Sequence, residues 1–180
     1  YFFYLKTNYS PIDYTLFFIM KKRYILVFSD FTTNRNGRNE VTKHVLKKFS
    51  NKFNLLKINT GIPYGCSKYD LLLKKIYLIY KAIIQTHYSK KKINSSYFVL
   101  SGGWGLFFDL LIIFYLNLLN KKIYINHHSF SYLNNYSFLI YILSLIGKKN
   151  ITHIVLCNLM KKKLKDYYFI KKIIVLSNVF

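Results

Sequence analysis

Two adjacent histidines, His127 and His128, are the residues of this chain best placed to do chemistry. They follow a short β-like run, KKIYI, and precede a helix-like run. A histidine at the end of a strand can donate to a sugar hydroxyl, or act as an acid or base near neutral pH. Because adjacent residues in an extended segment point in opposite directions, we expect only one of the two to face a ligand.

A glycine-rich turn, SGGWG (residues 101–105), follows one strand-like run and opens a helix-like run. Gly102 and Gly103 would let a phosphate or a sugar approach backbone N–H groups at the helix N-terminus, where the helix dipole favours anions. The dinucleotide-binding fingerprint is absent because Phe108 occupies the position of its last glycine, and the P-loop pattern is absent too. A ligand site and a tight turn that serves only packing both stay open.

The loop NRNGRNE (residues 34–40) leads into the first predicted helix. Arg35 and Arg38 could hold an anionic group with their forked donors, and the backbone amides after Gly37 could meet a ligand. The alternative is an exposed basic loop in which an asparagine caps the helix.

The other three histidines, His44, His87 and His153, fall on predicted helices or at the start of a predicted strand, and we interpret them as structural. No further His or Cys stands at zinc-ligand spacing, and Cys66 and Cys157 lie far apart. We therefore predict no metal site and no disulfide scaffold, with a reducing cytoplasm as the default compartment.

The elements that would position these residues alternate between strand and helix. Continuous apolar runs predict strands that are covered on both faces. The predicted strands are residues 23–29, 53–58, 97–101, 121–125, 152–157 and 171–177. The predicted helices are residues 38–49, 68–87, 106–119, 134–146 and 158–168. The alternation predicts an α/β fold, a Rossmann-like parallel sheet with helices on both faces.

In such a sheet ligands bind at the carboxyl ends of the strands, where the strand order reverses. That rule selects four loops as the place for a site: residues 29–37, 59–67, 101–105 and 126–133.

Three of the predicted helices are strongly apolar. The helix 68–87 carries a stripe at i, i+3, i+4 and i+7 spacing over five turns, with its lysines mostly outside it. The stripe consists of Tyr69, Leu72, Leu73, Ile76, Ile79, Tyr80, Ile83 and Ile84. The helix 106–119 is apolar nearly all round and, like the run 136–146, is expected to be buried in the protein rather than to span a membrane.

The chain is strongly basic, with 28 Lys and Arg against 6 Asp and Glu and a net charge of +22. Such a surface attracts anions, including membrane phospholipid, nucleotide phosphates and nucleic acid. The basic residues are spread in twos and threes along the chain and form no single arm. A generally basic surface that reflects the codon bias of an A+T-rich genome is the alternative to specific anion binding.

The two ends of the sequence bear on its domain organisation. Residues 1–19 match a signal peptide poorly and precede MKKRYILVFS, which resembles a natural protein start at Met20. The sequence stops directly after a predicted strand. We therefore expect an upstream segment, residues 1–19, and one domain, residues 20–180, truncated before a second domain.

From about Lys22 onward the ordered motifs resemble the N-terminal domain of family 4 glycosyltransferases, which have the GT-B fold. The motifs are, in chain order, NGRNEVTKHVLKKF, YFVLSGGWGLFFDLLIIFYL, NHHSFSYLN, HIVLCNLMKKKLKDYY and IIVLSNVF. In the last motif, residues 177–179 are Ser-Asn-Val where the family has Pro-Asn-Gly before its second domain.

The resemblance implies one half of a retaining transferase that moves a sugar from a nucleotide-sugar donor to a saccharide or lipid-linked acceptor, such as a lipopolysaccharide core. It implies no metal and no cofactor. The N-terminal domain binds the acceptor in this family, and the second domain carries a paired-glutamate motif that is absent here, so the fragment is expected to be inactive alone. By position, the family's histidine near the reacting sugar corresponds to His128 first and to His127 second.

The resemblance also implies where substrates bind and where the protein works. The first-loop glycine of the family corresponds to Gly37, and a basic surface would suit an enzyme on anionic lipid at the inner face of the cytoplasmic membrane. No nucleic acid is expected as a partner. The candidate substrate-binding residues are Gly37, Arg38, Gly102, Gly103, Trp104 and Ser129.

Two other classes of function stay open. A nucleotide-sugar epimerase of the same fold would release free nucleotide sugars without an acceptor. A non-enzymatic basic module would bind nucleic acid or anionic membrane in a strongly salt-dependent way.

Overall fold

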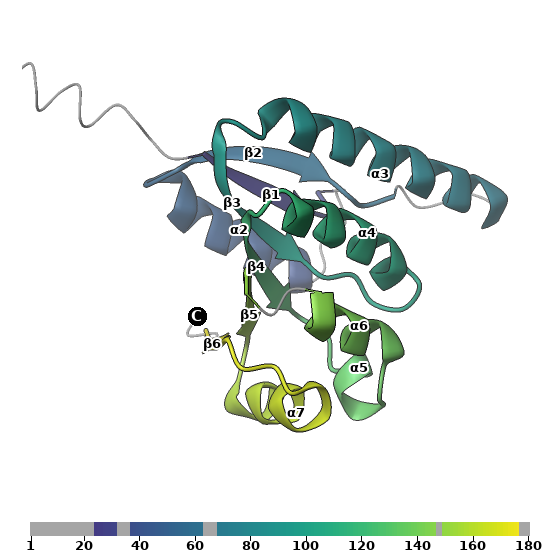
Figure 1. The fold of residues 1–180 in the computed structure, drawn as a ribbon, viewed down its shortest axis with the longest axis vertical. Helices are drawn as coiled ribbons and strands as arrows, with labels where there is room; N and C mark the ends of the chain where they lie inside the picture. The colour runs from purple at the N-terminus through teal and green to yellow at the C-terminus, as the bar shows by residue number, and fades with distance from the viewer. Residues whose placement is uncertain (1–23, 32–36, 63–67, 147–148, 177–180) are drawn as a thin grey trace, which may run out of the picture.

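The computed structural model describes residues 24–31, 37–62, 68–146 and 149–176. Six parallel strands form one sheet in the order β2-β1-β3-β4-β5-β6 (Figure 1). The strands are β1 (Tyr24–Ser29), β2 (Asn54–Asn59), β3 (Ile93–Val99), β4 (Lys122–His127), β5 (Ile151–Val155) and β6 (Ile173–Val175). The predicted α/β class and its parallel Rossmann-like sheet are confirmed.

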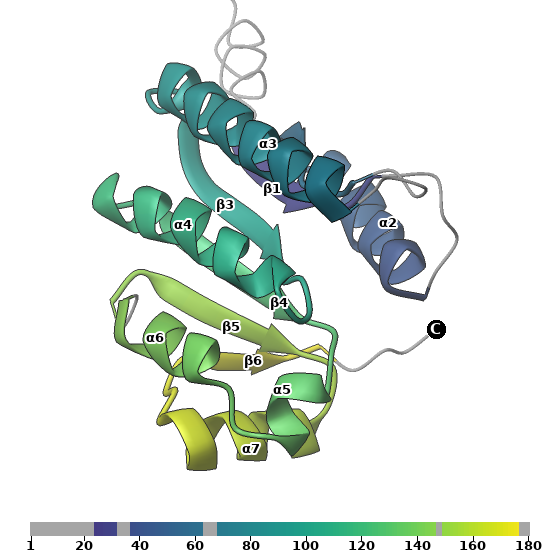
Figure 2. The same ribbon diagram turned by 90° about the vertical axis from the view of Figure 1, so that its right-hand side faces the viewer.

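The helices that connect these strands cover the two faces of the sheet unequally. They are α2 (Gly37–Ser50), α3 (Lys68–Ser89), α4 (Gly105–Leu118), α5 (Ser131–Asn134), α6 (Phe138–Ile146) and α7 (Asn158–Tyr168). Helix α2 packs through Leu46 on the face that carries Val27 and Tyr97. The opposite face is covered by α3, α4, α6 and α7 (Figures 1 and 2). This arrangement follows from right-handed crossovers, because the chain reverses direction across the sheet after β2.

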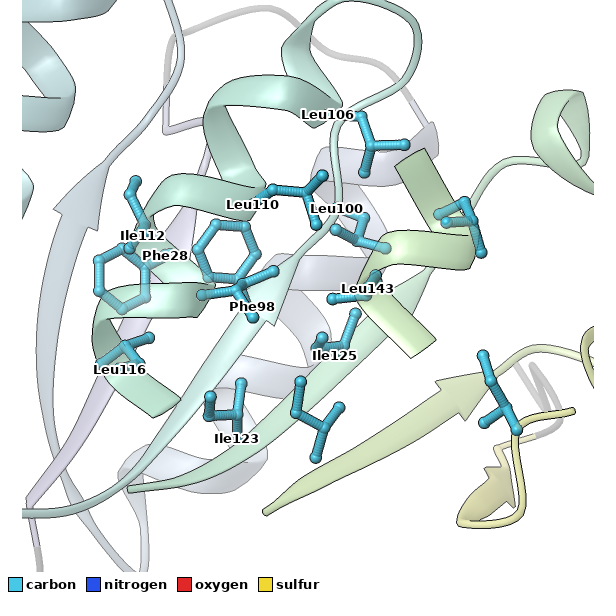
Figure 3. Close-up of a cluster of buried hydrophobic side chains, with 14 of the residues drawn as sticks. Phe28, Phe98, Leu100, Leu106, Leu110, Ile112, Leu116, Ile123, Ile125 and Leu143 are labelled. Carbon is cyan, nitrogen blue, oxygen red and sulfur yellow. The ribbon is translucent and has the colours of Figure 1, made fainter. Parts of the chain in front are cut away.

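The larger hydrophobic core lies between the sheet and the five helices α3, α4, α5, α6 and α7. Figure 3 shows its centre, where Phe28 of β1 and Phe98 of β3 stack with ring centroids 5.0 Å apart. Leu110 and Leu116 of α4 and Ile125 of β4 belong to the same cluster. This core fixes α4, and therefore the glycine turn before it, against the centre of the sheet.

The ends of some helices and strands differ from those predicted from the sequence. Strand β3 begins at Ile93, four residues earlier than predicted, because Ser95 and Ser96 pair with β1 and β4 in spite of their polar side chains. Ser96 is fully buried and its hydroxyl donates to the carbonyl of Lys122 at 3.4 Å. A two-sided ladder in the middle of a sheet therefore outweighs the low strand propensity of serine.

The burial predicted for two helices is wrong on their outer sides. Helix α4 is buried on one side only, and Phe107, Leu111, Phe114 and Leu118 are exposed on the other. On α6, Ile140 and Leu143 are buried, whereas Phe138 and Leu145 are exposed. Within the described residues, no helix has both the length and the apolar composition that crossing a membrane requires.

Candidate functional site

The strand order reverses between β1 and β3, so their carboxyl ends border the crevice in which α/β proteins of this topology bind ligands. A cavity of about 710 Å³ lies there. Three of the four loops selected from the sequence line it, through Asp30, through Thr60 to Ile62, and through Ser101, Gly102, Trp104 and Gly105. We call this cavity the β1–β3 pocket.

The rest of the β1–β3 pocket is formed by the two helices beside it. Helix α3 contributes Leu71, Leu72 and Lys75, and α4 contributes Phe107 and Phe108. Trp104 also lines the pocket, yet its side chain is 88% exposed. The pocket therefore combines a few polar groups at its sheet end with an apolar and aromatic side.

The sheet end of the pocket is held by hydrogen bonds between two loops. The side-chain oxygen of Asn59 accepts from the backbone N–H groups of Phe31 at 2.9 Å and Gly61 at 3.0 Å. A Cβ atom at Gly61 would lie 1.8 Å from Oδ1 of Asp30. Only glycine at this position lets the Asp30 carboxylate lie against the second loop.

The glycine turn is fixed by a buried carboxylate. Asp109, in the first half of α4, is 1% exposed, and its Oδ2 accepts from the backbone N–H of Ser101 at 2.6 Å. A Cβ atom at Gly105 would lie 2.7 Å from Cβ of Ser101, and Gly103 has a φ of +57°. Both glycines are therefore required by the close, partly left-handed turn.

The predicted ligand-facing glycines of this turn are exposed. An added Cβ atom at Gly102 or Gly103 would meet no atom within 4 Å. Gly102 and Trp104 line the pocket directly, whereas Gly103 stands in the turn between them. Asp109 is the residue that sequence reasoning missed here. An isolated acid in an apolar helix, eight residues after the start of a glycine turn, is the signal that could have found it.

His127 does not lie in the loop. It is the last residue of β4, is fully buried, and its Nε2 lies 2.8 Å from Nδ1 of His153 on β5. Its Nδ1 lies 3.1 Å from the hydroxyl of Tyr132 on α5. The structure thus places His127 inside the core, where its ring joins β4, β5 and α5.

The protonation of this pair is governed by its burial. Burial lowers the pKa of His127 well below 6.5, and repulsion from His153 and His128 lowers it further. Burial likewise lowers the pKa of His153 to about 4. Both rings are therefore neutral near pH 7, as a chain of hydrogen bonds between them requires.

His128 follows the strand and is half-buried at the edge of the sheet. The backbone N–H of Leu100 donates to the carbonyl of Asn126 at 3.2 Å, which extends the pairing of β3 and β4 beyond the strand. The glycine turn and the loop after β4 (residues 128–130), which we call the histidine loop, therefore start side by side. His128 does not line the β1–β3 pocket itself.

The remainder of the histidine loop and the segment after it are held by hydrogen bonds. Ser129 accepts from the backbone N–H of Ser131 at 3.1 Å, and the two hydroxyls are 2.8 Å apart, so Ser129 supports the start of the short helix α5. The hydroxyl of Tyr168 on α7 donates to the carbonyl of Tyr132 at 2.6 Å and accepts from the N–H of Ser137 at 2.9 Å. Sequence reasoning did not predict α5.

Some candidate residues lie outside the part of the chain that the structure describes. Gly37 is the first residue of α2, at the same edge of the sheet, but the side chains of residues 37–41, Arg38 included, lie outside the described residues. The same holds for residues 1–19, Arg35 and residues 177–179. In the described part of the chain, no three His, Cys, Asp or Glu side chains gather as metal ligands would.

No protein-family model matches this chain, and no curated protein matches its sequence. The fold, the β1–β3 pocket and the adjacent histidine loop are therefore the observations from which a function can be argued.

Proposed function

We propose that this chain is the acceptor-binding half of a GT-B glycosyltransferase, and that the β1–β3 pocket holds a saccharide or a lipid-linked saccharide. The donor nucleotide sugar would be held by a second domain, and the sugar would be transferred with retention of configuration. The observation that carries the proposal is the composition of the pocket at the point where the strand order reverses.

A sugar ring offers hydroxyl groups at its edge and C–H groups on its faces. The carboxylate of Asp30 and the hydroxyls of Thr60 and Ser101 suit the hydroxyl groups, because charged acceptors make stronger hydrogen bonds than neutral ones. The exposed indole of Trp104 suits a C–H face. The apolar side of the pocket, which includes Leu72 and Phe107, would accommodate the first part of a lipid chain.

His128 would act at the border between acceptor and donor. It stands one residue beyond β4, next to the glycine turn, and an imidazole there can hydrogen-bond a sugar hydroxyl or act as a general acid or base. The proposed transfer needs no metal ion, since developing charge on the leaving phosphate would be met by donors of the second domain.

Titration calorimetry with a panel of saccharides and nucleotide sugars tests the proposal on the 180-residue chain. Saccharide binding is expected, and nucleotide sugars alone should bind weakly or not at all. Asp30→Asn should weaken saccharide binding by about tenfold, because it replaces a charged acceptor by a neutral one.

Asp166→Asn is the matched control for that substitution, because it removes the same charge from an exposed site on α7. It should leave saccharide affinity unchanged. Tight binding of a nucleotide sugar that Asp30→Asn abolishes, with every saccharide inert, would contradict the acceptor assignment and favour an epimerase-like use of the pocket.

A further inference from the structure

The outer side of α4 presents a continuous apolar stripe to solvent. Phe107, Leu111, Phe114 and Leu118 stand at i, i+4, i+7 and i+11, so they share one face of the helix, and each is 43–61% exposed. The opposite side of the helix supplies Ile113 and Leu116 to the core. A helix of a globular protein normally turns one apolar side inward and a polar side to water; α4 has no polar side.

Helix α3 also presents apolar side chains to solvent, and it presents more of them than α4 does. It packs on the sheet through a narrow strip of small and medium side chains, Ile79, Ala82 and Thr86. Its predicted apolar stripe lies mostly on the solvent side instead. The large apolar and aromatic residues of α3 that are more than half exposed are Tyr69, Leu72, Leu73, Ile76, Tyr77, Tyr80 and Tyr88.

The two helices lie side by side on one face of the sheet and pack against each other (Figure 2). Their exposed apolar side chains therefore belong to one side of the molecule, with Trp104 at the start of α4. We call this side the α3–α4 face. Monomeric soluble proteins seldom expose so many large apolar side chains together, so the face calls for a partner.

We propose that the α3–α4 face docks on a lipid bilayer that contains anionic lipid. Lys74 and Lys81 are exposed on α3 along one border of its apolar side, and Lys91 and Lys92 are exposed just beyond its end. Apolar and aromatic side chains bordered by lysines are the features that let a helix lie in the interface of an anionic membrane. The tyrosines and Trp104 suit the headgroup level, where amphipathic rings gather.

Net charge favours an anionic membrane over a second copy of the chain as the partner of this face. Two copies that each carry a net charge of +22 would repel one another across a shared face, whereas an anionic bilayer attracts the same charge. Docking stands on α3 and α4 alone and does not depend on any transfer reaction.

One consequence of docking does rest on the proposed function. Leu72, Trp104 and Phe107 belong both to the α3–α4 face and to the β1–β3 pocket. A docked protein would therefore present the apolar side of that pocket to the bilayer, where a lipid-linked acceptor resides.

Co-sedimentation with vesicles tests the docking on the 180-residue chain. Binding is expected to phosphatidylcholine vesicles that contain phosphatidylglycerol, and to be much weaker to phosphatidylcholine alone. The double substitution Leu73→Gln with Ile76→Gln should weaken binding by about tenfold or more, because two apolar side chains no longer leave water. Leu159→Gln, on the exposed side of α7, is the control and should bind as the unchanged chain does.

A second pair of variants tests the role of charge. Lys74→Gln with Lys81→Gln should weaken binding by about fivefold for each lysine, and added salt should reduce the difference. Lys162→Gln with Lys165→Gln removes two exposed lysines from α7 and should weaken binding less. Circular dichroism of every variant confirms that it folds.

Three results would overturn the proposal. They are an absence of vesicle binding, equal binding by the Leu73/Ile76 variant, and a dimer in sedimentation equilibrium that the same double substitution dissociates. The last result would assign the α3–α4 face to self-association. Vesicle binding that persists when every saccharide proves inert would leave docking standing and remove only the proposed function.

Discussion

The β1–β3 pocket and the histidine loop lie at the same edge of the sheet, but residues at the pocket are exposed and the histidines beside the loop are buried. At the pocket, Trp104 and Gly102 are exposed and Asp30 lines an open cavity. Beside the loop, His127 at the end of β4 and His153 on β5 are fully or almost fully buried and hydrogen-bond to one another. The comparison teaches that residue type alone does not mark a site, because the register of a strand decides which side chain turns inward.

The largest expected effect separates the two adjacent histidines. In the complete two-domain enzyme that the proposed function implies, His128→Ala should lower kcat by about 100-fold or more, as expected when a general acid or base is removed. Its melting temperature should stay close to that of the unchanged protein. His127→Ala should instead lower the melting temperature strongly, because it opens a cavity in the core and leaves His153 without its partner.

Steady-state kinetics and thermal unfolding of both variants measure this contrast. Normal turnover in His128→Ala would remove His128 from the mechanism. A stable His127→Ala protein would show that the buried ring is not a structural element.

The second effect is acid sensitivity of the buried pair. An unfolded histidine gains a proton below about pH 6.5, whereas burial keeps His127 and His153 neutral in the folded protein. The unfolded state then binds more protons than the folded state, so the free energy of unfolding falls as the pH falls from 6.5 towards 4. For His153, whose pKa is lowered to about 4, the loss approaches roughly 3 kcal/mol at the acid end.

Urea unfolding at a series of pH values measures that loss. His153→Gln should flatten the decline between pH 6.5 and 4. Tyr132→Phe, which removes the hydroxyl partner of His127 and no titrating imidazole, should lower stability evenly and leave the slope unchanged. Equal slopes in His153→Gln and the unchanged protein would contradict the role given to this ring.

The third effect concerns the buried carboxylate behind the glycine turn. Asp109→Ala should cost about 2 kcal/mol of unfolding free energy, because the N–H of Ser101 loses its acceptor in a buried place. Asp109→Asn keeps an acceptor oxygen of the same shape and should cost less. Urea denaturation compares the two, and an equal loss in both variants would show that the charge, rather than the hydrogen bond, holds the turn.

The smallest effect is expected from a matched pair of substitutions within the glycine turn. Gly103→Ala should cost about 1–2 kcal/mol, because alanine is strained at a φ of +57°. Gly102→Ala has no such strain and, like Gly103→Ala, meets no neighbouring atom, so it should be nearly neutral. Thermal unfolding of both proteins checks the difference, and equal melting temperatures would refute the left-handed requirement at Gly103.

The alternation of apolar runs and amphipathic helices was sufficient to predict the parallel sheet and the edge at which a site should lie. Three of the four loops it selected meet at the β1–β3 pocket. Asp109 was marked in the sequence as an isolated acid in an apolar helix, but its contact could not be predicted, because it joins the side chain to a backbone N–H whose position depends on the turn.

The burial of the apolar helices was the part that sequence periodicity predicted poorly. A stripe on α3 shows which residues share a face, but the small side chains Ala82 and Thr86 let the opposite face approach the sheet. Likewise, the first half of β3 was not predicted because it contains polar serines. The burial of His127 depended on where β4 ends. In each case a tertiary contact, invisible in a local window, decided the outcome.

Fluorescence of Trp104 tests the central claim most directly, because it is the single tryptophan of the chain and lines the β1–β3 pocket. Titration with an acceptor saccharide, in the absence of lipid, should shift its emission to shorter wavelength in a saturable way. Asp30→Asn should move the midpoint to about tenfold higher concentration. Emission that stays constant while calorimetry records saccharide binding would place the acceptor elsewhere and contradict the account.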